Sequence, residues 1–270
     1  MTQATVNMLT VDVEDWQQST LDSTLPISGR VLASTRRLLG ILAEARVKGT
    51  FFFQGMVAER YPELVEQVAA EGHEVASHGD SHTPIFHLSP TEFAQETDRS
   101  LALLRNQCSH AVIGYRAPDF SIRPDTMWAL DVLIRAGIRY DSSVFPFRGI
   151  RYGIPSGLTR PYVIKDGLLE VPLATIRFAG TNWPVAGGGY FRLPPYFLTR
   201  WAIRRINAEG RPAVVYLHPY ELDDREMYQF RGRIPWSLYW SQSLNRSRTE
   251  PKIRSLLRDF RFAPIREVVA

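Results

Sequence analysis

Two histidines early in the chain have the spacing of metal ligands. His78 and His82 follow the short strand-like run 73–76, where a buried strand would end and a loop would begin. In a loop or an incipient helical turn, residues four apart lie on one side, so both imidazole rings can reach one ion. Two imidazoles and one carboxylate with an open coordination position form the ligand set of a hydrolytic, zinc-type site.

A cluster of three acidic residues could supply the missing carboxylate. Asp12, Glu14 and Asp15 follow the apolar run 8–11, and three negative charges beside buried residues indicate a compensating cation. One carboxylate would complete the metal site and another could act as a general base. A divalent ion and a nearby arginine would keep both carboxylates ionised.

A basic residue at each of two further strand ends could serve the same chemistry. Arg116 precedes Pro118, whose ring stiffens the loop, so we expect the guanidinium to point inward at a carboxylate. His218 ends an apolar run and could protonate a leaving group while a carboxylate holds its other ring nitrogen. Asp141 and Glu170 are the candidates for that carboxylate.

The pattern between these residues predicts a parallel sheet with helices on both faces. Helical patterns alternate with short apolar runs, as expected of βαβ units. Ser89 opens an S-x-x-E capping box, and glycines end several of the helical patterns. The predicted helices include 90–107, 123–136, 194–209 and 251–260. Polar residues that recur where parallel strands end are typical of a barrel with its active site on the carboxyl rim.

Composition limits the classes of protein to consider. A chain of 270 residues with 44% hydrophobic and 22% charged residues predicts one folded, soluble domain. The single cysteine, Cys108, excludes an internal disulfide framework and a cysteine-rich structural zinc site. The N-terminus has no basic region of a signal peptide and no window suits a membrane span, which predicts a cytoplasmic protein. The net charge is +4, but the basic residues are scattered, so we expect no nucleic-acid partner.

Taken in order, the four motifs resemble those of the polysaccharide deacetylase family (NodB homology, family-four carbohydrate esterases). The resemblance runs from Leu9 to His218, and the remaining tail resembles an extension in a branch linked to exopolysaccharide biosynthesis. It implies an α/β fold, a distorted (β/α)7 barrel over residues 1–222, with a C-terminal extension, 223–270, packed on the same domain. It also implies a divalent metal, most often zinc, and hydrolysis of N-acetyl groups from an amino sugar in a polysaccharide, oligosaccharide or lipid-linked glycan.

The resemblance also implies roles for individual residues. His78, His82 and Asp15 would bind the metal, Asp12 would be the general base, Arg116 would orient the base, and His218 would be the acid. The acidic block departs from the family's two adjacent aspartates, which leaves alternatives open. Glu14 becomes the base if it forms the equivalent pair with Asp15, whereas an Asp-Val-Asp pattern makes Asp12 the base and position 14 a ligand.

The expected partner is an N-acetylated glycan, bound by Pro118, Phe120, Trp183 and Tyr190. The stretch 228–240 combines aromatic and basic residues, which suits peripheral association with the inner face of a membrane. Two alternatives are a cyclic amide hydrolase of the allantoinase type and a non-catalytic glycan-binding barrel. The sequence does not indicate which sugar is bound or which oligomeric state the protein adopts.

Overall fold

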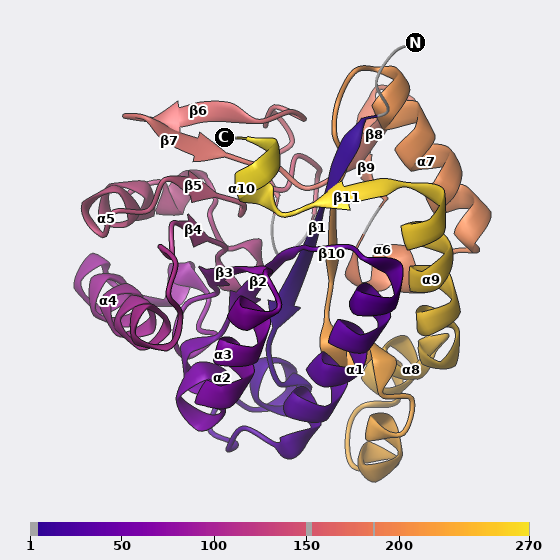
Figure 1. Ribbon diagram of the computed structural model, residues 1–270, viewed down its shortest axis with the longest axis horizontal. Helices are drawn as coiled ribbons and strands as arrows, with labels where there is room; N and C mark the ends of the chain where they lie inside the picture. The colour runs from indigo at the N-terminus through magenta and orange to yellow at the C-terminus, as the bar shows by residue number, and fades with distance from the viewer. Residues whose placement is uncertain (1–4, 150–152, 186, 270) are drawn as a thin grey trace.

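A curled sheet of mostly parallel strands forms the centre of the protein (Figure 1). The computed structural model describes residues 5–149, 153–185 and 187–269. Within them, the strand order is β10-β1-β2-β3-β4-β5-β7-β6. All neighbours in this order are parallel except β6 and β7. The strands are β1 (Val6–Val13), β2 (Thr50–Phe53), β3 (Glu74–Ser77), β4 (Gly114–Tyr115), β5 (Tyr140–Asp141), β6 (Tyr162–Lys165), β7 (Leu168–Glu170) and β10 (Val214–Leu217).

Single contacts, rather than a full strand pairing, bring the two ends of the sheet together. Beyond β7, the amide of Ala174 donates to the carbonyl of Val214 on β10 at 3.2 Å. Gly187 forms an isolated parallel bridge with Tyr216 on the same strand. A Cβ at Gly187 would lie 2.0 Å from the Tyr216 ring, so this close approach requires glycine. The result is the distorted barrel that the family resemblance implies.

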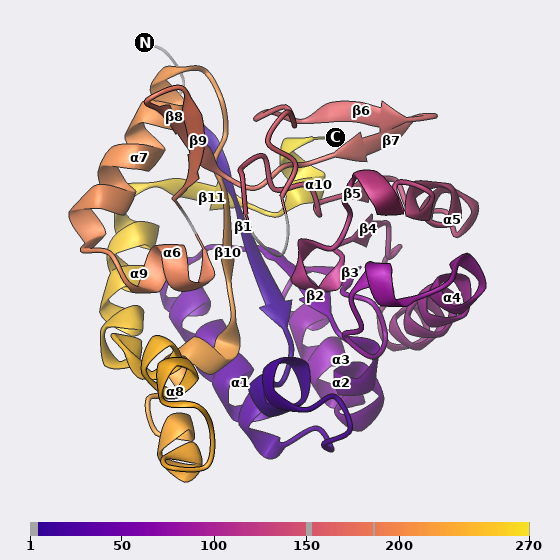
Figure 2. The ribbon, with the colours of Figure 1, turned by 180° about the vertical axis from the view of Figure 1, so that it is seen from behind.

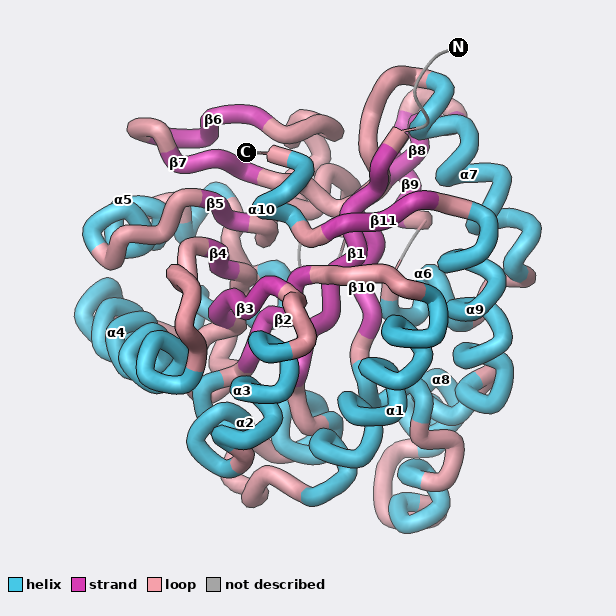
Figure 3. The backbone as a smooth tube through the Cα atoms, viewed as in Figure 1, coloured by secondary structure: helices cyan, strands magenta, loops and turns pink. Residues whose placement is uncertain are grey.

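Helices cover the outside of the sheet (Figure 3). The capping box at Ser89 is confirmed, since its side chain and that of Glu92 bond reciprocally to each other's backbone amides. The predicted helix 123–136 is shorter, because a 3-10 turn, Pro124–Thr126, precedes α5. The helices are α1 (Gly29–Ala45), α2 (Gly55–Arg60), α3 (Pro62–Ala70), α4 (Pro90–Gln107), α5 (Ala129–Arg135), α6 (Gly188–Arg192), α7 (Tyr196–Ala208), α8 (Trp236–Ser243), α9 (Thr249–Asp259) and α10 (Ile265–Val268).

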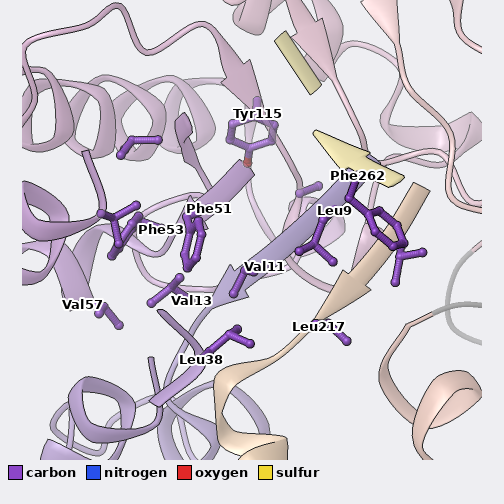
Figure 4. Close-up of a cluster of buried hydrophobic side chains, with 14 of the residues drawn as sticks. Leu9, Val11, Val13, Leu38, Phe51, Phe53, Val57, Tyr115, Leu217 and Phe262 are labelled. Atoms are coloured by element: carbon purple, nitrogen blue, oxygen red, sulfur yellow. The ribbon is translucent and has the colours of Figure 1, made fainter. Parts of the chain in front are cut away.

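Alternation along β1 separates a hydrophobic core from the barrel interior. Leu9, Val11 and Val13 are fully buried in the core beneath the helices, where Leu38 of α1 belongs to the same cluster (Figure 4). Burial of each such side chain contributes about 1.5–3 kcal/mol to folding. The even-numbered residues face the opposite way, because side chains in a strand alternate. Met8 accordingly belongs to a second cluster, inside the barrel.

The C-terminal residues complete the same sheet and helical layer. Strand β11 (Arg261–Ala263) pairs in parallel with the first residues of β1. Helix α9 contacts α1, and Glu250 of α9 forms an ion pair with Arg37 of α1 at 2.6 Å. A second hairpin, β8 (Thr175–Phe178) and β9 (Thr181–Pro184), stands beside α7 (Figure 2). Among the described residues, no helix is both long and apolar enough to cross a membrane.

Candidate functional site

Glu14, His78 and His82 form a cluster at the carboxyl rim of the sheet. Each offers one ligand atom, and these atoms lie within 4.8 Å of one another. Glu14 Oε2 is 3.5 Å from the Nε2 atom of His78 and also contacts that of His82. All three side chains are buried. Burial opposes ionisation of Glu14, but the two histidines outweigh it and hold the pKa of that carboxyl well below its usual range.

The hydrogen bonding of His78 leaves one ring nitrogen available for a metal. Its Nδ1 lies 2.8 Å from the backbone carbonyl oxygen of Arg116, which can only accept a hydrogen bond. Nδ1 therefore carries the proton, and Nε2 presents a lone pair toward Glu14 in the neutral ring. Glu14 Oε2 is buried and has no hydrogen-bond partner among the described residues. A divalent cation fits this donor set, because it would satisfy the carboxylate and both imidazoles together.

The loop that carries the two histidines is held by the start of α2 rather than by a helical turn of its own. The amide of Gly55 donates to the carbonyl of Gly79 at 2.9 Å, and that of Met56 donates to Asp80 at 3.1 Å. A Cβ at Gly55 would lie 2.2 Å from the Asp80 carboxylate, so glycine is needed there. His82 has a left-handed φ of 64°, a conformation that histidine adopts more often than most residues other than glycine. The loop brings the centroid of the His82 ring to 5.2 Å from that of His78.

The structure does not bring Asp15 to this cluster. Its two carboxylate oxygens accept hydrogen bonds from the amide and the hydroxyl of Ser28, at 2.7 and 2.9 Å. Ser28 is the N-cap residue of α1, so Asp15 anchors the start of that helix. Alternation explains the outcome, since Asp12 and Glu14 are two residues apart and share a side, whereas Asp15 faces the helices. The prediction of Asp15 as third ligand does not fit this geometry, and Glu14 occupies that position instead.

Asp12 lies beside the cluster, paired with Arg116 as predicted. Arg116 Nη1 donates to Asp12 Oδ1 at 2.7 Å, and both side chains are buried. The guanidinium also bonds to Thr10 and Ser142 and lies over the Phe52 ring, 4.2 Å from its centroid. These contacts fix one oxygen of Asp12 and leave Oδ2 directed toward the ring of His218, 3.9 Å from Nε2.

His218 faces the cluster from the end of β10. Its Nε2 is 3.7 Å from Glu14 Oε1, and its Nδ1 is 3.4 Å from Glu221 Oε2. The Tyr220 ring stacks on the imidazole at 4.8 Å. Burial disfavours the charged ring, but the hydrogen bond to Glu221 and the charges of Glu14 and Asp12 outweigh it and raise the pKa of His218 to about 9. A cation bound by Glu14 would offset part of that increase.

The partner of His218 differs from the two predicted candidates. Glu221 holds the ring nitrogen and in turn accepts a hydrogen bond from buried Arg192 at 2.9 Å. Asp141 and Glu170 form a separate buried pair, bonded to the Ser143 hydroxyl and the Val144 amide. The i, i+3 spacing of His218 and Glu221 in the sequence was the available signal, because a carboxylate one turn away can reach the same ring.

These groups open into one cavity of about 410 Å³. Of the residues predicted to bind substrate, Phe120 and Tyr190 line it. Pro118 does not, and instead packs against Gly79. Trp183 is exposed and lines a separate apolar groove, whose wall includes Tyr190 as well. The cavity is also lined by three residues that the sequence did not single out, Leu193, Ser241 and Gln242.

The two halves of the chain match different protein families. Residues 9–140 match the family described as polysaccharide deacetylase. This half of the chain belongs to the polysaccharide deacetylase family. Residues 142–270 match a domain of unknown function, which contributes His218, Glu221 and Arg192 to the site. The family resemblance predicted from the four motifs is therefore confirmed.

Curated relatives of this polysaccharide deacetylase domain include two chitooligosaccharide deacetylases. The protein from Bradyrhizobium sp. (strain ANU 289) is 33% identical over 37% of this chain and 43% of its own length. The protein from Rhizobium leguminosarum bv. trifolii is 31% identical over 53% of this chain and 60% of its own. The chain thus spans about half the length of these relatives.

Solved structures confirm the barrel fold. A protein from Mycobacterium smegmatis described as a polysaccharide deacetylase matches with a TM-score of 0.61 and 22% identity, over 99% of this chain and 91% of its own. Puue allantoinase matches with a TM-score of 0.64 and 13% identity, over 97% of this chain and 87% of its own. At these identities the likeness concerns the fold, and it confirms the predicted (β/α)7 barrel of the polysaccharide deacetylase type.

Proposed function

We propose that the protein hydrolyses N-acetyl groups from an amino sugar within a glycan, using one divalent metal ion. The observation that carries the proposal is the convergence of three kinds of group in one cavity. A His-His-carboxylate donor set, a carboxylate fixed by a buried arginine, and a histidine held by a second carboxylate all meet there. Each corresponds to one requirement of metal-assisted amide hydrolysis.

We propose zinc as the metal, held by Glu14, His78 and His82. Two imidazole nitrogens and one carboxylate oxygen, with further positions open to the cavity, form a donor set typical of catalytic zinc. When bound, the ion acts as a Lewis acid that polarises the acetyl carbonyl and acidifies water. The residues fit this role, because the Nδ1 of His78 is bonded to a carbonyl and leaves Nε2 for the metal in the neutral ring, while Glu14 Oε2 has no hydrogen-bond partner among the described residues.

In the proposed reaction, Asp12 is the general base and His218 the general acid. Asp12 Oδ2 accepts a proton from the attacking water while Arg116 holds Oδ1, which keeps the carboxylate oriented. The water oxygen bonds to the acetyl carbon, and the bond from that carbon to the sugar nitrogen breaks. His218 Nε2 donates a proton to this nitrogen, so that an amine leaves together with acetate. Glu221 supports the protonated ring. Proton transfer by a positioned general acid typically accelerates a reaction 10²–10⁴-fold.

The assignment of the third ligand is tested by a matched pair of substitutions. Glu14→Gln should abolish both zinc retention, measured by mass spectrometry after dialysis, and acetate release. Asp15→Asn removes the same charge from a neighbouring position but affects only the start of α1. It should therefore retain zinc and lower the free energy of unfolding by about 1–2 kcal/mol. The opposite result, with zinc lost from Asp15→Asn and kept by Glu14→Gln, would show that the ligands are misassigned.

The substrate class is tested with a panel of compounds. We expect acetate release from N-acetylated chito-oligosaccharides and no ring opening of small cyclic ureides. Ring opening without acetate release would favour an allantoinase-type hydrolase. Glycan binding with an empty metal site and no turnover would indicate a non-catalytic barrel. The proposal also includes three predictions: a role in exopolysaccharide biosynthesis, a cytoplasmic location, and peripheral membrane association of residues 228–240. The proposed glycan is polymeric, an oligosaccharide or lipid-linked.

A further inference from the structure

An exposed apolar face lies beside the candidate active site. We define it as the outer side chains of the β8–β9 hairpin and of the first half of α7, namely Phe178, Trp183, Phe197, Leu198 and Trp201. Each is substantially exposed, Phe178 by 62% and Phe197 by 65%. Large apolar side chains gathered in this way on a soluble surface mark an interaction site.

The face contains a groove whose lining is almost wholly apolar. The groove has a volume of about 470 Å³ and lies between the hairpin and α7. Ile176 and Trp183 are directly opposite each other in the hairpin and both line it. Helix α7 is apolar on two sides. Its inner side, with Ala202, Ile203 and Ile206, packs into the protein. Its outer apolar residues therefore have no role in the core.

Exposed arginines lie on the same two elements as the apolar face. On α7 these are Arg200, Arg204 and Arg205, and α7 contains no acidic residue. On the hairpin, Arg177 alternates with Ile176 and Phe178 and therefore lies on the other side, where it lines a separate cavity. Two of the α7 arginines have acidic partners, Asp259 at 3.3 Å and Glu209 at 3.6 Å. A helix with aromatic and aliphatic residues on one outer strip and arginines beside it suits the surface of an anionic bilayer.

The apolar face also adjoins the mouth of the cavity. Tyr190 lines both the groove and the cavity. On the other side of the cavity, Ser241 and Gln242 belong to α8, which carries the exposed rings of Trp236 and Trp240. Helices α7, α6 and α8 follow one another along the same side of the molecule in Figures 1 and 2. Exposed aromatic residues therefore flank the cavity from two directions.

We propose that the apolar face docks on an anionic lipid bilayer, with the groove taking a hydrocarbon chain and the cavity held at the lipid surface. A bilayer explains the combination of an apolar groove, protruding aromatic rings and neighbouring arginines on α7, which a polar glycan does not. A consequence is that the glycan acted on is presented at a membrane, and this consequence alone rests on the proposed function.

Vesicle binding tests the proposal without any substrate. The protein is sedimented with vesicles of phosphatidylcholine, alone or mixed with phosphatidylglycerol, at low and high salt. We expect binding to the mixed vesicles that weakens with salt. The double variant Phe178→Ser, Phe197→Ser should bind at least roughly tenfold more weakly. Val163→Ser is the matched control, since Val163 is 63% exposed on β6, and it should bind like the unaltered protein.

Two results would overturn the proposal. One is absence of binding to the mixed vesicles by the unaltered protein. The other is equal binding by the double variant, with circular dichroism showing that it is folded. A self-association that the double variant abolishes, without vesicle binding, would assign the face to a second copy of the chain. Acetate release from a soluble chito-oligosaccharide is measured in parallel, so that failure of the deacetylase proposal is seen separately.

Discussion

Arg116 and Asp12 form a buried ion pair, so their contributions to the free energy of unfolding should be strongly coupled. Both side chains are almost fully buried, and the guanidinium donates to Asp12, Thr10 and Ser142. Arg116→Met removes all of these bonds and leaves the buried Asp12 carboxylate with only the more distant His218 ring, 3.9 Å away, as a counter-charge. Such a change typically destabilises by about 3–5 kcal/mol. Asp12→Asn keeps an acceptor for Arg116, so we expect a smaller loss of roughly 1.5–3 kcal/mol.

The double variant shows whether the two losses share a cause. Once Asp12 is replaced by Asn, removal of Arg116 no longer leaves a buried carboxylate without its ion-pair partner. The loss of stability in the double variant should therefore be about 1–3 kcal/mol smaller than the sum of the two single losses. Urea unfolding in the presence of a chelator measures all four proteins. Arg258→Met is the control, because that side chain is 73% exposed and its pairing with Asp259 should contribute at most about 1 kcal/mol. Additive losses, or a loss below 1 kcal/mol for Arg116→Met, would refute the argument.

Three further outcomes are expected. His218→Ala should keep its zinc but lower the turnover number by roughly 10²-fold or more, measured as acetate release under saturating substrate; unchanged turnover would remove His218 from the mechanism. Glu221→Gln keeps an acceptor for Arg192 but removes a charge that raises the pKa of His218. The pH above which turnover falls, because the acid has lost its proton, should therefore be lower in this variant. An unchanged pH limit would contradict this. Burial lowers the pKa of His73 to about 4. Below about pH 6.5 the unfolded state therefore binds a proton that the native state does not, and the free energy of unfolding should fall by roughly 3 kcal/mol as the pH drops from 6.5 to 4. Urea unfolding should show a weaker dependence of stability on pH for His73→Asn.

The sequence predicted the fold well, because its signals are local. Strand ends could be located from apolar runs, and the residues expected there, among them His78, Arg116 and His218, do lie at the carboxyl ends of strands. The capping box at Ser89 needs only residues three apart. The end of α1 was harder to predict. Arg46, rather than a glycine, adopts the left-handed conformation there. Gly49, three residues later, is required for another reason, because a Cβ there would lie 2.8 Å from the carbonyl oxygen of Leu9. A close approach between separate strands leaves no local pattern.

The same distinction explains which site residues were predicted. His78 and Arg116 directly follow strands β3 and β4, and His82 lies four residues after His78, so residue type and spacing sufficed to predict them. The partners of His218 did not follow from type, because several buried carboxylates competed for that role. Arg192 bonds to Glu221 and to the carbonyl of Ser241 on α8, and only the folded chain brings these three segments together. Trp183 was predicted from its aromatic character, which suits a sugar platform and an exposed apolar face equally well.

Strand alternation accounts for the division of work among the three neighbouring acids. Asp12 and Glu14 lie on the barrel side of β1 and its extension, where Arg116 neutralises the first and the two histidines face the second. Their different neighbours are the basis of their different proposed roles, because Arg116 holds Asp12 Oδ1, whereas Glu14 Oε2 faces His78 and His82. Asp15 faces outward and holds the start of α1 through Ser28. Moving any of the three by one position would exchange the inner and outer sides, so the pattern of an acid at every second residue, rather than the number of acids, is what specifies the site.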